Sequence, residues 1–156
     1  MKLLAAYLFL LCAAMPAAAA TCGTVLNPVL ITVSSVAFGP YSPGDMTGDQ
    51  ANGSIGVTCT VTLSSALPNF TIALNGGLAN QLNSRVMSFL GNNLQYNLYT
   101  TGSYATIWGD GTTSTQTQSY TAGAASTSYT VYGLIPNHQF LPIGLYLDTI
   151  TVTVTY

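Results

Sequence analysis

Hydrophobic and polar residues alternate with a period of two along most of the chain, and the period of an amphipathic helix is almost absent. The clearest example is 149–156, where Ile, Val, Val and Tyr occupy one face and four threonines occupy the other. This pattern predicts a half-buried strand of an antiparallel sheet with a polar outer face. Further strands are predicted at 29–34, 55–63, 70–74, 84–89, 94–98, 116–121 and 127–134.

Short segments rich in glycine, proline and asparagine separate these predicted strands, and such residues favour turns. The segments are Gly39-Pro40, Ser42-Pro43-Gly44-Asp45, Asn75-Gly76-Gly77, Gly91-Asn92-Asn93, Gly109-Asp110-Gly111, Pro136-Asn137 and Pro142-Ile143-Gly144. About seven short strands at this spacing predict an all-β fold, an Ig-like antiparallel β-sandwich. The sequence shows no internal repeat and no second domain, and the Thr- and Ser-rich run 109–128 is either a hairpin or a polar loop.

The first 20 residues have the order that a secretory signal peptide needs. Lys2 supplies a positive charge, residues 3–15 form an apolar run, and Pro16 precedes four alanines. The run is shorter than the roughly 20 apolar residues that span a bilayer, which disfavours a membrane anchor. A second alternative to a signal peptide is that the apolar run forms a buried core helix. We therefore expect an exported protein with a signal peptide at 1–20 and one domain at 21–156.

Two cysteines, Cys22 and Cys59, remain in the predicted domain, because Cys12 belongs to the signal peptide. An even number of cysteines in an exported chain predicts a disulfide. Closing this loop would stabilise the fold by roughly 3–4 kcal/mol. The alternative is two separate buried thiols, which the oxidising environment outside the cytoplasm disfavours.

Charged side chains are rare in this sequence. Beyond the signal peptide the chain has one cation, Arg85, together with four aspartates and no glutamate. A single cation excludes the basic face that nucleic-acid binding needs, and it also excludes a polybasic patch for a membrane surface. Solubility must then depend on Ser, Thr, Asn and Gln, and such an uncharged surface associates readily with other proteins.

No group of residues in the sequence points to catalysis, a cofactor or a metal ion. His138 is the only histidine, and the scattered aspartates do not form a paired-carboxylate site. Asp110 offers a single carboxylate between two glycines, which is too little for calcium and is better explained as a turn. A Ser–His–Asp triad lacks any nucleophile motif that would place it. We therefore expect a protein that is not an enzyme and that needs no cofactor or metal.

Arg85 and Asp148 are the charged residues most relevant to the interior. Arg85 lies in a predicted strand, and Asp148 shares the inward register of the last strand with Ile150 and Val152. Because buried charges need partners, one hypothesis is a partly buried Arg85–Asp148 ion pair. The alternative is two separate, solvated charges, and the sequence does not decide between them.

Several residue groups, taken in order along the chain, carry a family resemblance. They are Phe38-Gly39-x-Tyr41, Gly53–Cys59, Arg85-Val86-Met87, Leu94–Tyr99, Trp108–Gly111, Tyr132–Pro136 and Gly144-x-Tyr146-x-Asp148-Thr149, with an aromatic final residue. Their order and spacing resemble the spore coat protein U-like domain, the family that includes subunits of Csu-type archaic chaperone–usher pili. The resemblance covers nearly the whole of 21–156.

This resemblance implies an incomplete Ig-like sandwich that lacks its last strand. A periplasmic chaperone would lend a strand to the open groove, and a neighbouring pilus subunit would later replace it at an outer-membrane usher. Ile150, Val152 and Val154 would line this groove, because they share one face of the final strand and no later segment follows to cover it.

The implied function is a structural or adhesive pilus subunit that passes through the periplasm to the cell surface. A stand-alone secreted surface or coat protein of the same fold is the alternative, and a secreted enzyme or carbohydrate-binding module is a third class. Neither membrane insertion nor nucleic-acid binding is expected.

The region before the first cysteine departs from the fibre-forming members, which carry a donor segment there. In this chain Cys22 comes almost directly after the predicted signal peptide. Three interpretations are open. The subunit accepts a strand without donating one and so forms the tip or ends the chain, or Val25–Val33 donates despite following the cysteine, or the protein is not a fibre subunit.

Overall fold

The computed structural model describes residues 20–43, 47–60 and 65–156. Residues 1–19 of the predicted signal peptide lie outside this range, so the structure does not test that prediction. No helix in the described ranges is long and apolar enough to cross a membrane.

The strands are β1 (Ala20–Thr21), β2 (Val29–Ser34), β3 (Asp49–Cys59), β4 (Ser65–Ala66), β5 (Phe70–Leu74), β6 (Arg85–Phe89), β7 (Asn92–Tyr99), β8 (Gln118–Tyr120), β9 (Ser126–Ile135) and β10 (Val152–Thr155), with a 3₁₀ turn η1 (Gly77–Ala79) after β5.

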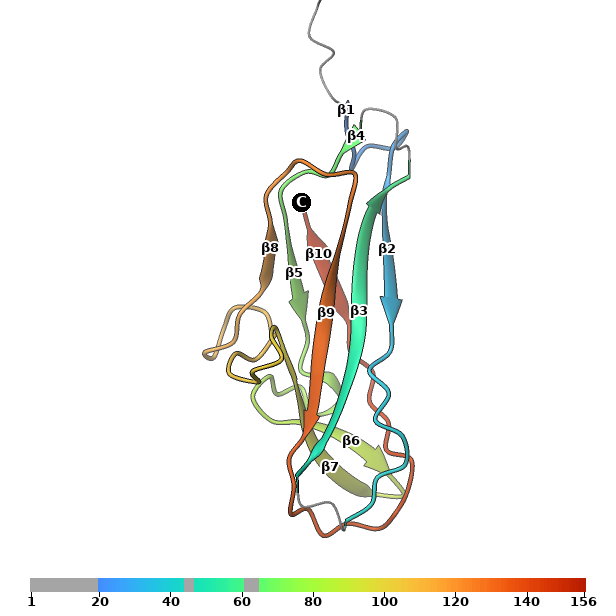
Figure 1. Cartoon of the computed structure of the whole chain (residues 1–156), viewed down its shortest axis with the longest axis vertical. Helices are drawn as coiled ribbons and strands as arrows, with labels where there is room; N and C mark the ends of the chain where they lie inside the picture. Colours follow the sequence, from blue (N-terminus) through green and yellow to red (C-terminus); the bar gives the residue numbers. More distant parts are fainter. Residues whose placement is uncertain (1–19, 44–46, 61–64) are drawn as a thin grey trace, which may run out of the picture.

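The described strands form two antiparallel sheets and one short parallel pair (Figure 1). The larger sheet has the order β2-β3-β9-β7-β6, and the smaller sheet has the order β10-β5-β8. The parallel pair β1-β4 lies at the end of the molecule near the start of β2 (Figure 1). This arrangement confirms the predicted all-β antiparallel sandwich.

The centre of the larger sheet is the long pairing of β3 with β9, which runs from Asp49↔Ile135 to Thr58↔Ser126. Period-two alternation turns the apolar residues of both strands to the same side, where Ile55, Val57, Val131 and Ile135 are buried. Each such side chain contributes roughly 1.5–3 kcal/mol when it leaves water. The core therefore lies between the two sheets, as the alternation predicts.

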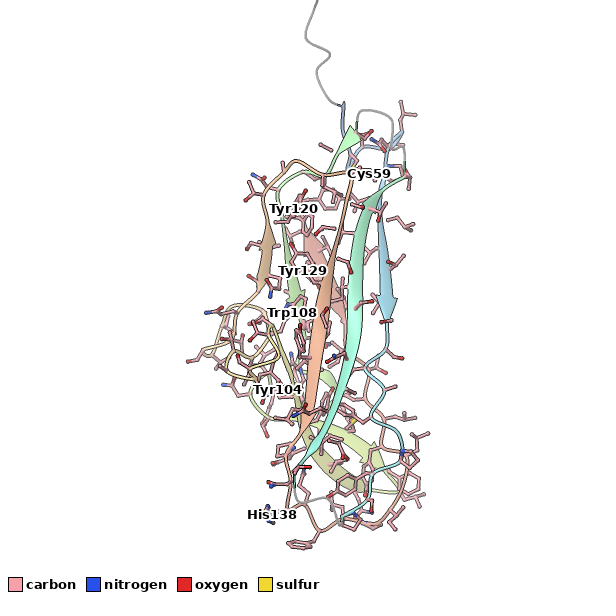
Figure 2. All side chains as sticks on the ribbon, viewed as in Figure 1. Cys59, Tyr104, Trp108, Tyr120, Tyr129 and His138 are labelled. Carbon is pink, nitrogen blue, oxygen red and sulfur yellow. A yellow bond between two sulfur atoms is a disulfide. The ribbon has the colours of Figure 1, made fainter. Side chains whose placement is uncertain are left out.

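Trp108 closes one side of the sandwich (Figure 2). Its side chain is fully buried, and its indole Nε1 donates a hydrogen bond to the Ile72 carbonyl of β5 at 3.0 Å. Its backbone N–H donates to the Leu98 carbonyl of β7 at 2.9 Å, and the Leu74 N–H of β5 donates to the Gly109 carbonyl at 3.0 Å. This short segment thus bonds to both sheets and seals the gap between them.

A disulfide joins Cys22 to Cys59, the two cysteines that the sequence pairs, with a Cα–Cα distance of 5.8 Å. Both residues are buried, and Cys59 lies at the end of β3 (Figure 2). The bond therefore ties the segment before β2 to the strand that pairs with β2.

Candidate functional site

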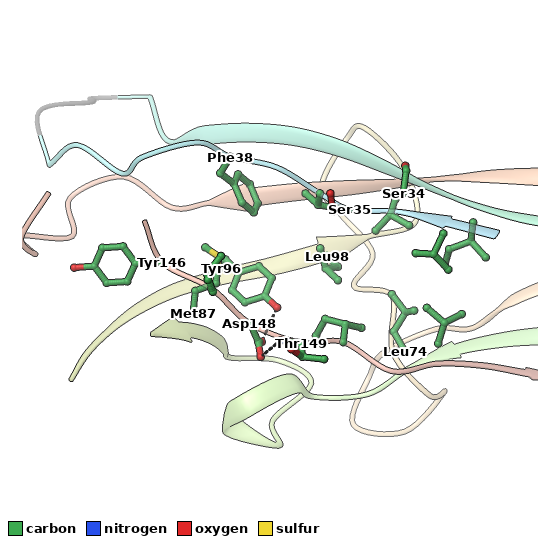
Figure 3. Close-up of a pocket in the computed structure, with 17 residues that line it drawn as sticks. Ser34, Ser35, Phe38, Leu74, Met87, Tyr96, Leu98, Tyr146, Asp148 and Thr149 are labelled. Atoms are coloured by element: carbon green, nitrogen blue, oxygen red, sulfur yellow. Dashed lines mark hydrogen bonds between the residues drawn. The ribbon is translucent and has the colours of Figure 1, made fainter. Parts of the chain in front are cut away.

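A groove of about 460 Å³ lies between β2 and the segment that leads into β10 (Figure 3). One wall comes from Val33, Ser34, Ser35, Val36 and Phe38, and the other comes from Tyr146 to Ile150 together with Val152. Residues from both sheets form the floor, namely Ile55, Leu74, Met87, Tyr96, Leu98 and Val131. The groove is therefore an opening into the core of the sandwich.

The inward face of β2 is incompletely covered. Ile31 and Val33 lie opposite Val57 and Ile55 of β3, so all four side chains point to the same side of the sheet. The two β3 residues are 0% and 1% exposed, whereas Ile31 and Val33 are 40% and 59% exposed. The apolar face of β2 therefore borders open space in the place where a sandwich core would continue.

The same contrast holds for β10 on the other wall. Val152 and Val154 lie opposite Leu74 and Ile72 of β5, which are buried, yet the two valines are only partly buried. Of the three residues that the sequence places in the groove, Ile150 and Val152 line it, and Val154 continues the same face of the strand beyond it. Their contact with a partner strand remains a prediction.

Two glycines allow the first wall to pack directly on the larger sheet. A Cβ atom at Gly53 of β3 would lie 2.9 Å from a methyl group of Val36. A Cβ atom at Gly133 of β9 would lie 2.5 Å from Val36 and 2.6 Å from the Phe38 ring. This wall was not predicted from the sequence, although a glycine inside a strand is a signal for close approach of another segment.

An aromatic cluster closes one end of the groove. The Tyr146 ring packs edge-on against Tyr41 at 5.9 Å between centroids and lies 5.5 Å from the Phe89 ring. Tyr41 and Tyr146 are buried, and the Tyr146 hydroxyl donates to the Pro142 carbonyl at 2.9 Å. Because these rings fill the space between the walls, an extended chain in the groove would end here.

A polar pair, Tyr96 and Asp148, lies in the middle of the groove (Figure 3). The Tyr96 hydroxyl donates to Asp148 Oδ2 at 2.7 Å, and the N–H groups of Leu78 and Thr149 donate to Oδ1 at 2.8 and 2.7 Å. Burial raises the pKa of Tyr96, and the hydrogen bond to Asp148 raises it further. The phenol therefore keeps its proton at neutral pH and acts as a donor to the carboxylate.

Arg85 is fully buried, and its hydrogen bonds go to neutral oxygens and not to the hypothesised ion-pair partner Asp148. Its Nε and Nη2 donate to the Asn75 carbonyl at 3.0 and 2.8 Å, and Nη2 also donates to the Trp108 carbonyl at 2.8 Å. Its Nη1 donates to Asn97 Oδ1 at 2.6 Å. Burial lowers the pKa of Arg85, and the charge of Asp148 opposes this effect. The alternative of a solvated arginine is also wrong, because neutral oxygens surround the guanidinium.

The remaining candidates for chemistry are separate from one another. Asp110 accepts hydrogen bonds from the N–H and the hydroxyl of Thr112 at 2.8 and 2.6 Å, as in an Asx turn. These bonds lower the pKa of Asp110. His138 lies exposed in a loop near one end of the molecule (Figure 2). Among the residues with described positions, no three His, Cys, Asp or Glu side chains could hold a metal ion.

The comparisons with known proteins agree with this geometry. The family model described as Spore Coat Protein U domain matches residues 8–153. Among solved structures, the chain is similar to one in the crystal structure of the CsuC-CsuE chaperone-tip adhesion subunit pre-assembly complex from archaic chaperone-usher Csu pili of Acinetobacter baumannii, with a TM-score of 0.58 and 25% identity. The alignment covers 85% of this chain but 40% of that chain. No curated protein matches.

Proposed function

The chain belongs to the Spore Coat Protein U domain family, as its sequence predicts, and from this premise we propose that it is a subunit of an archaic chaperone–usher pilus. A β-strand from another polypeptide fills the groove between β2 and β10. The observation that carries this proposal is the exposure of Ile31 and Val33, which face inward yet are 40% and 59% exposed. A strand in the groove would cover them and would bond to the free edges of the two walls.

The groove, when extended along β2 and along β10, suits a strand of about eight residues. The first wall with its continuation along β2 runs from 31 to 38, and the second runs from 146 to 154. At about 3.3 Å per residue, an eight-residue strand is about 26 Å long. Roughly four of its side chains would point inward, and each would contribute about 1.5–3 kcal/mol before the entropy cost of ordering.

The partners follow from this mode of binding. A periplasmic chaperone would supply the first strand, and another pilus subunit would replace it at an outer-membrane usher. The similar solved structure is a complex of a chaperone with a tip subunit, which supports a chaperone as a partner of this chain. Export through the periplasm to the cell surface, with a signal peptide at 1–20, belongs to the same proposal. The subunit acts by binding and assembly and not by catalysis.

Within the pilus, we assign the subunit to the tip or to the end of a chain. Of the segment Val25–Val33, which could have donated a strand, the part from Val29 is already paired with β3 in this protein's own sheet. That pairing argues against donation from this segment. A subunit that accepts a strand but donates none cannot fill the groove of a further subunit, and so it terminates the fibre.

An added strand tests the proposal directly. A variant would carry, after Tyr156, a turn of about four residues and an eight-residue strand of alternating Val and Thr. If the groove accepts this strand, the protein should be monomeric, and its Tm should exceed that of the unextended protein by about 10–20 °C. The control replaces the inward valines of the added strand with aspartate and should give no gain.

The opposite outcome has a clear meaning. If the unextended protein is already a soluble monomer that unfolds cooperatively, and the added strand leaves its Tm unchanged, the sandwich is complete by itself. The stand-alone secreted surface or coat protein would then be the better description.

A further inference from the structure

We infer that Tyr96 and Asp148 select a neutral residue that donates a hydrogen bond, such as serine, threonine or asparagine, at one position of the strand that fills the groove. This inference rests on the proposed function and adds a rule for which strands fit. It follows from the polarity of the second wall, from the free capacity of the carboxylate and from the charges nearby.

The second wall has one polar position in an otherwise apolar row. Burial alternates along this wall: Leu147, Thr149 and Thr151 are exposed, and the residues between them, which face inward, are Tyr146, Asp148, Ile150 and Val152. Of the described residues that line the groove, only Asp148 has a charged side chain. Figure 3 shows it between Tyr146 on one side and Leu74 on the other. An incoming strand would therefore meet apolar neighbours at three positions and a carboxylate at the fourth.

The hydrogen bonds described above leave one acceptor site of the Asp148 carboxylate unused. An ionised carboxylate has about four acceptor sites. Two bonds to Oδ1, from Leu78 and Thr149, and one bond to Oδ2, from Tyr96, occupy three of them. An apolar side chain at this position would keep water away from Oδ2 and would offer it no hydrogen bond. A buried acceptor site without a donor is costly. A hydroxyl or amide on the incoming strand would supply the missing donor.

The neighbouring charges favour a neutral donor over a charged one. An acidic residue on the strand would be repelled by Asp148. A lysine or arginine would have to leave water in a closed groove, and it would approach Arg85, which lies opposite Tyr96 in the pairing of β6 with β7. Arg85 is itself a cation whose donors bond to neutral oxygens, so it would repel a second cation.

The protein with the added strand described above allows a positional test. The turn after Tyr156 fixes the register, so that one valine of the added strand lies opposite each inward position of the wall. Each valine is changed to serine in turn, and the equilibrium constant for folding is measured by urea denaturation. Opposite Ile150 or Val152, serine should lower this constant about tenfold, because it removes buried apolar surface. Opposite Asp148, serine should leave it unchanged or raise it, whereas lysine or aspartate should lower it.

A substitution in the second wall distinguishes a role of Asp148 in selecting the strand from a purely structural role. Asp148→Leu removes the bonds to Leu78 and Thr149 and should destabilise the protein with either strand. It should also reverse the preference at that position from serine to valine. If the preference for serine persists, Asp148 does not select the strand. Should Asp148→Leu fail to fold, Tyr96→Phe serves instead, because it frees a second acceptor site on Oδ2 and should increase the preference for serine.

The outcomes distinguish the inference from the function on which it rests. If no added strand stabilises the protein, the proposed function fails. If added strands stabilise it but serine costs the same opposite all three wall positions, the proposed function stands and the selectivity of Tyr96 and Asp148 is refuted.

Discussion

The two long sides of the sandwich differ, because one is closed and the other is open. On one side, the segment around Trp108 bonds to β5 and to β7, and the indole fills the gap between the sheets. On the other side, β2 and β10 face each other across a groove, and no segment of the described chain bridges them. Both sides present apolar side chains, but Trp108 is fully buried on the closed side, whereas Ile31 and Val33 stay partly exposed on the open side. The closed side therefore differs from the open side in that a buried ring fills the gap between the two sheets.

The largest expected effect comes from placing a charge on the open side. Val152→Asp puts a carboxylate in the apolar wall of the groove. Burying it under a strand without a partner is unfavourable enough to abolish the gain in Tm from the added strand. Thr153→Asp is the matched control, because Thr153 is exposed on the other face of the same strand. In cells, the Val152→Asp subunit should not be captured by a chaperone and should be degraded in the periplasm. Equal gains in Tm for both variants would contradict this placement of the groove.

Opening the closed side should have the next largest effect. Trp108→Ala removes a fully buried ring and its hydrogen bond to the Ile72 carbonyl. The free energy of unfolding should fall by about 3–5 kcal/mol. Phe140→Ala provides the comparison, since Phe140 is 85% exposed and its loss should change stability by less than about 0.5 kcal/mol. Urea denaturation of the protein with the added strand measures both. A small effect of Trp108→Ala would mean that this side is not sealed by the ring.

A smaller effect is expected from narrowing the groove. Gly133→Ala would bring a methyl group within 2.6 Å of Val36 and Phe38, so the first wall must move. We expect a loss of about 1–3 kcal/mol in the free energy of unfolding and weaker binding of the added strand. Ser128→Ala, an exposed position on the same strand, should change neither quantity. If Gly133→Ala lowered stability without affecting the added strand, the glycine would matter for the sheet and not for the groove.

The smallest effect concerns alkaline pH. Because the pKa of Tyr96 is raised in the folded protein, the folded state keeps a proton that the unfolded chain releases above about pH 10. Stability should be unaffected by this group below that pH and should fall as the pH rises above it, by at most about 1.4 kcal/mol per pH unit. Tyr96→Phe should reduce this slope. An unchanged slope in urea titrations between about pH 9 and 11 would show that Tyr96 ionises as freely in the folded protein as in the unfolded chain.

Strands whose two faces differ in polarity could be predicted closely from the sequence. The predicted strands 29–34 and 70–74 coincide with β2 and β5, because alternation determines which side chains can be buried. In contrast, β3 begins at Asp49, six residues before the predicted start at 55. Residues 49–54 contain little apolar surface, and main-chain pairing with β9 makes them a strand. Such pairing leaves no trace in a local pattern of polarity.

The candidate site was predicted only where it depends on that alternation. The inward register of Ile150 and Val152 follows from the sequence, and the structure places both in the groove. The partners of Arg85 could not be predicted, because they are main-chain carbonyls of Asn75 and Trp108, which only the folded chain brings together. The regular part of the last strand is also shorter than predicted. Leu147 still pairs with Ser88 of the larger sheet before the chain crosses to the smaller one.

The disulfide has a mechanical consequence for the proposed role in a fibre. Cys22 and Cys59 are 37 positions apart, and the covalent link between them bypasses β2 and nearly all of β3. When the chain is pulled from points outside this loop, tension passes through the two sulfur atoms, and the enclosed residues are not stretched. At roughly 3.5 Å per residue, the enclosed chain is about 130 Å long when extended. While the disulfide is intact, this length is not released when the domain unfolds under tension. The wall of the groove that β2 provides therefore stays within reach of its partners when the rest of the domain is stretched, which favours rapid refolding once the tension falls.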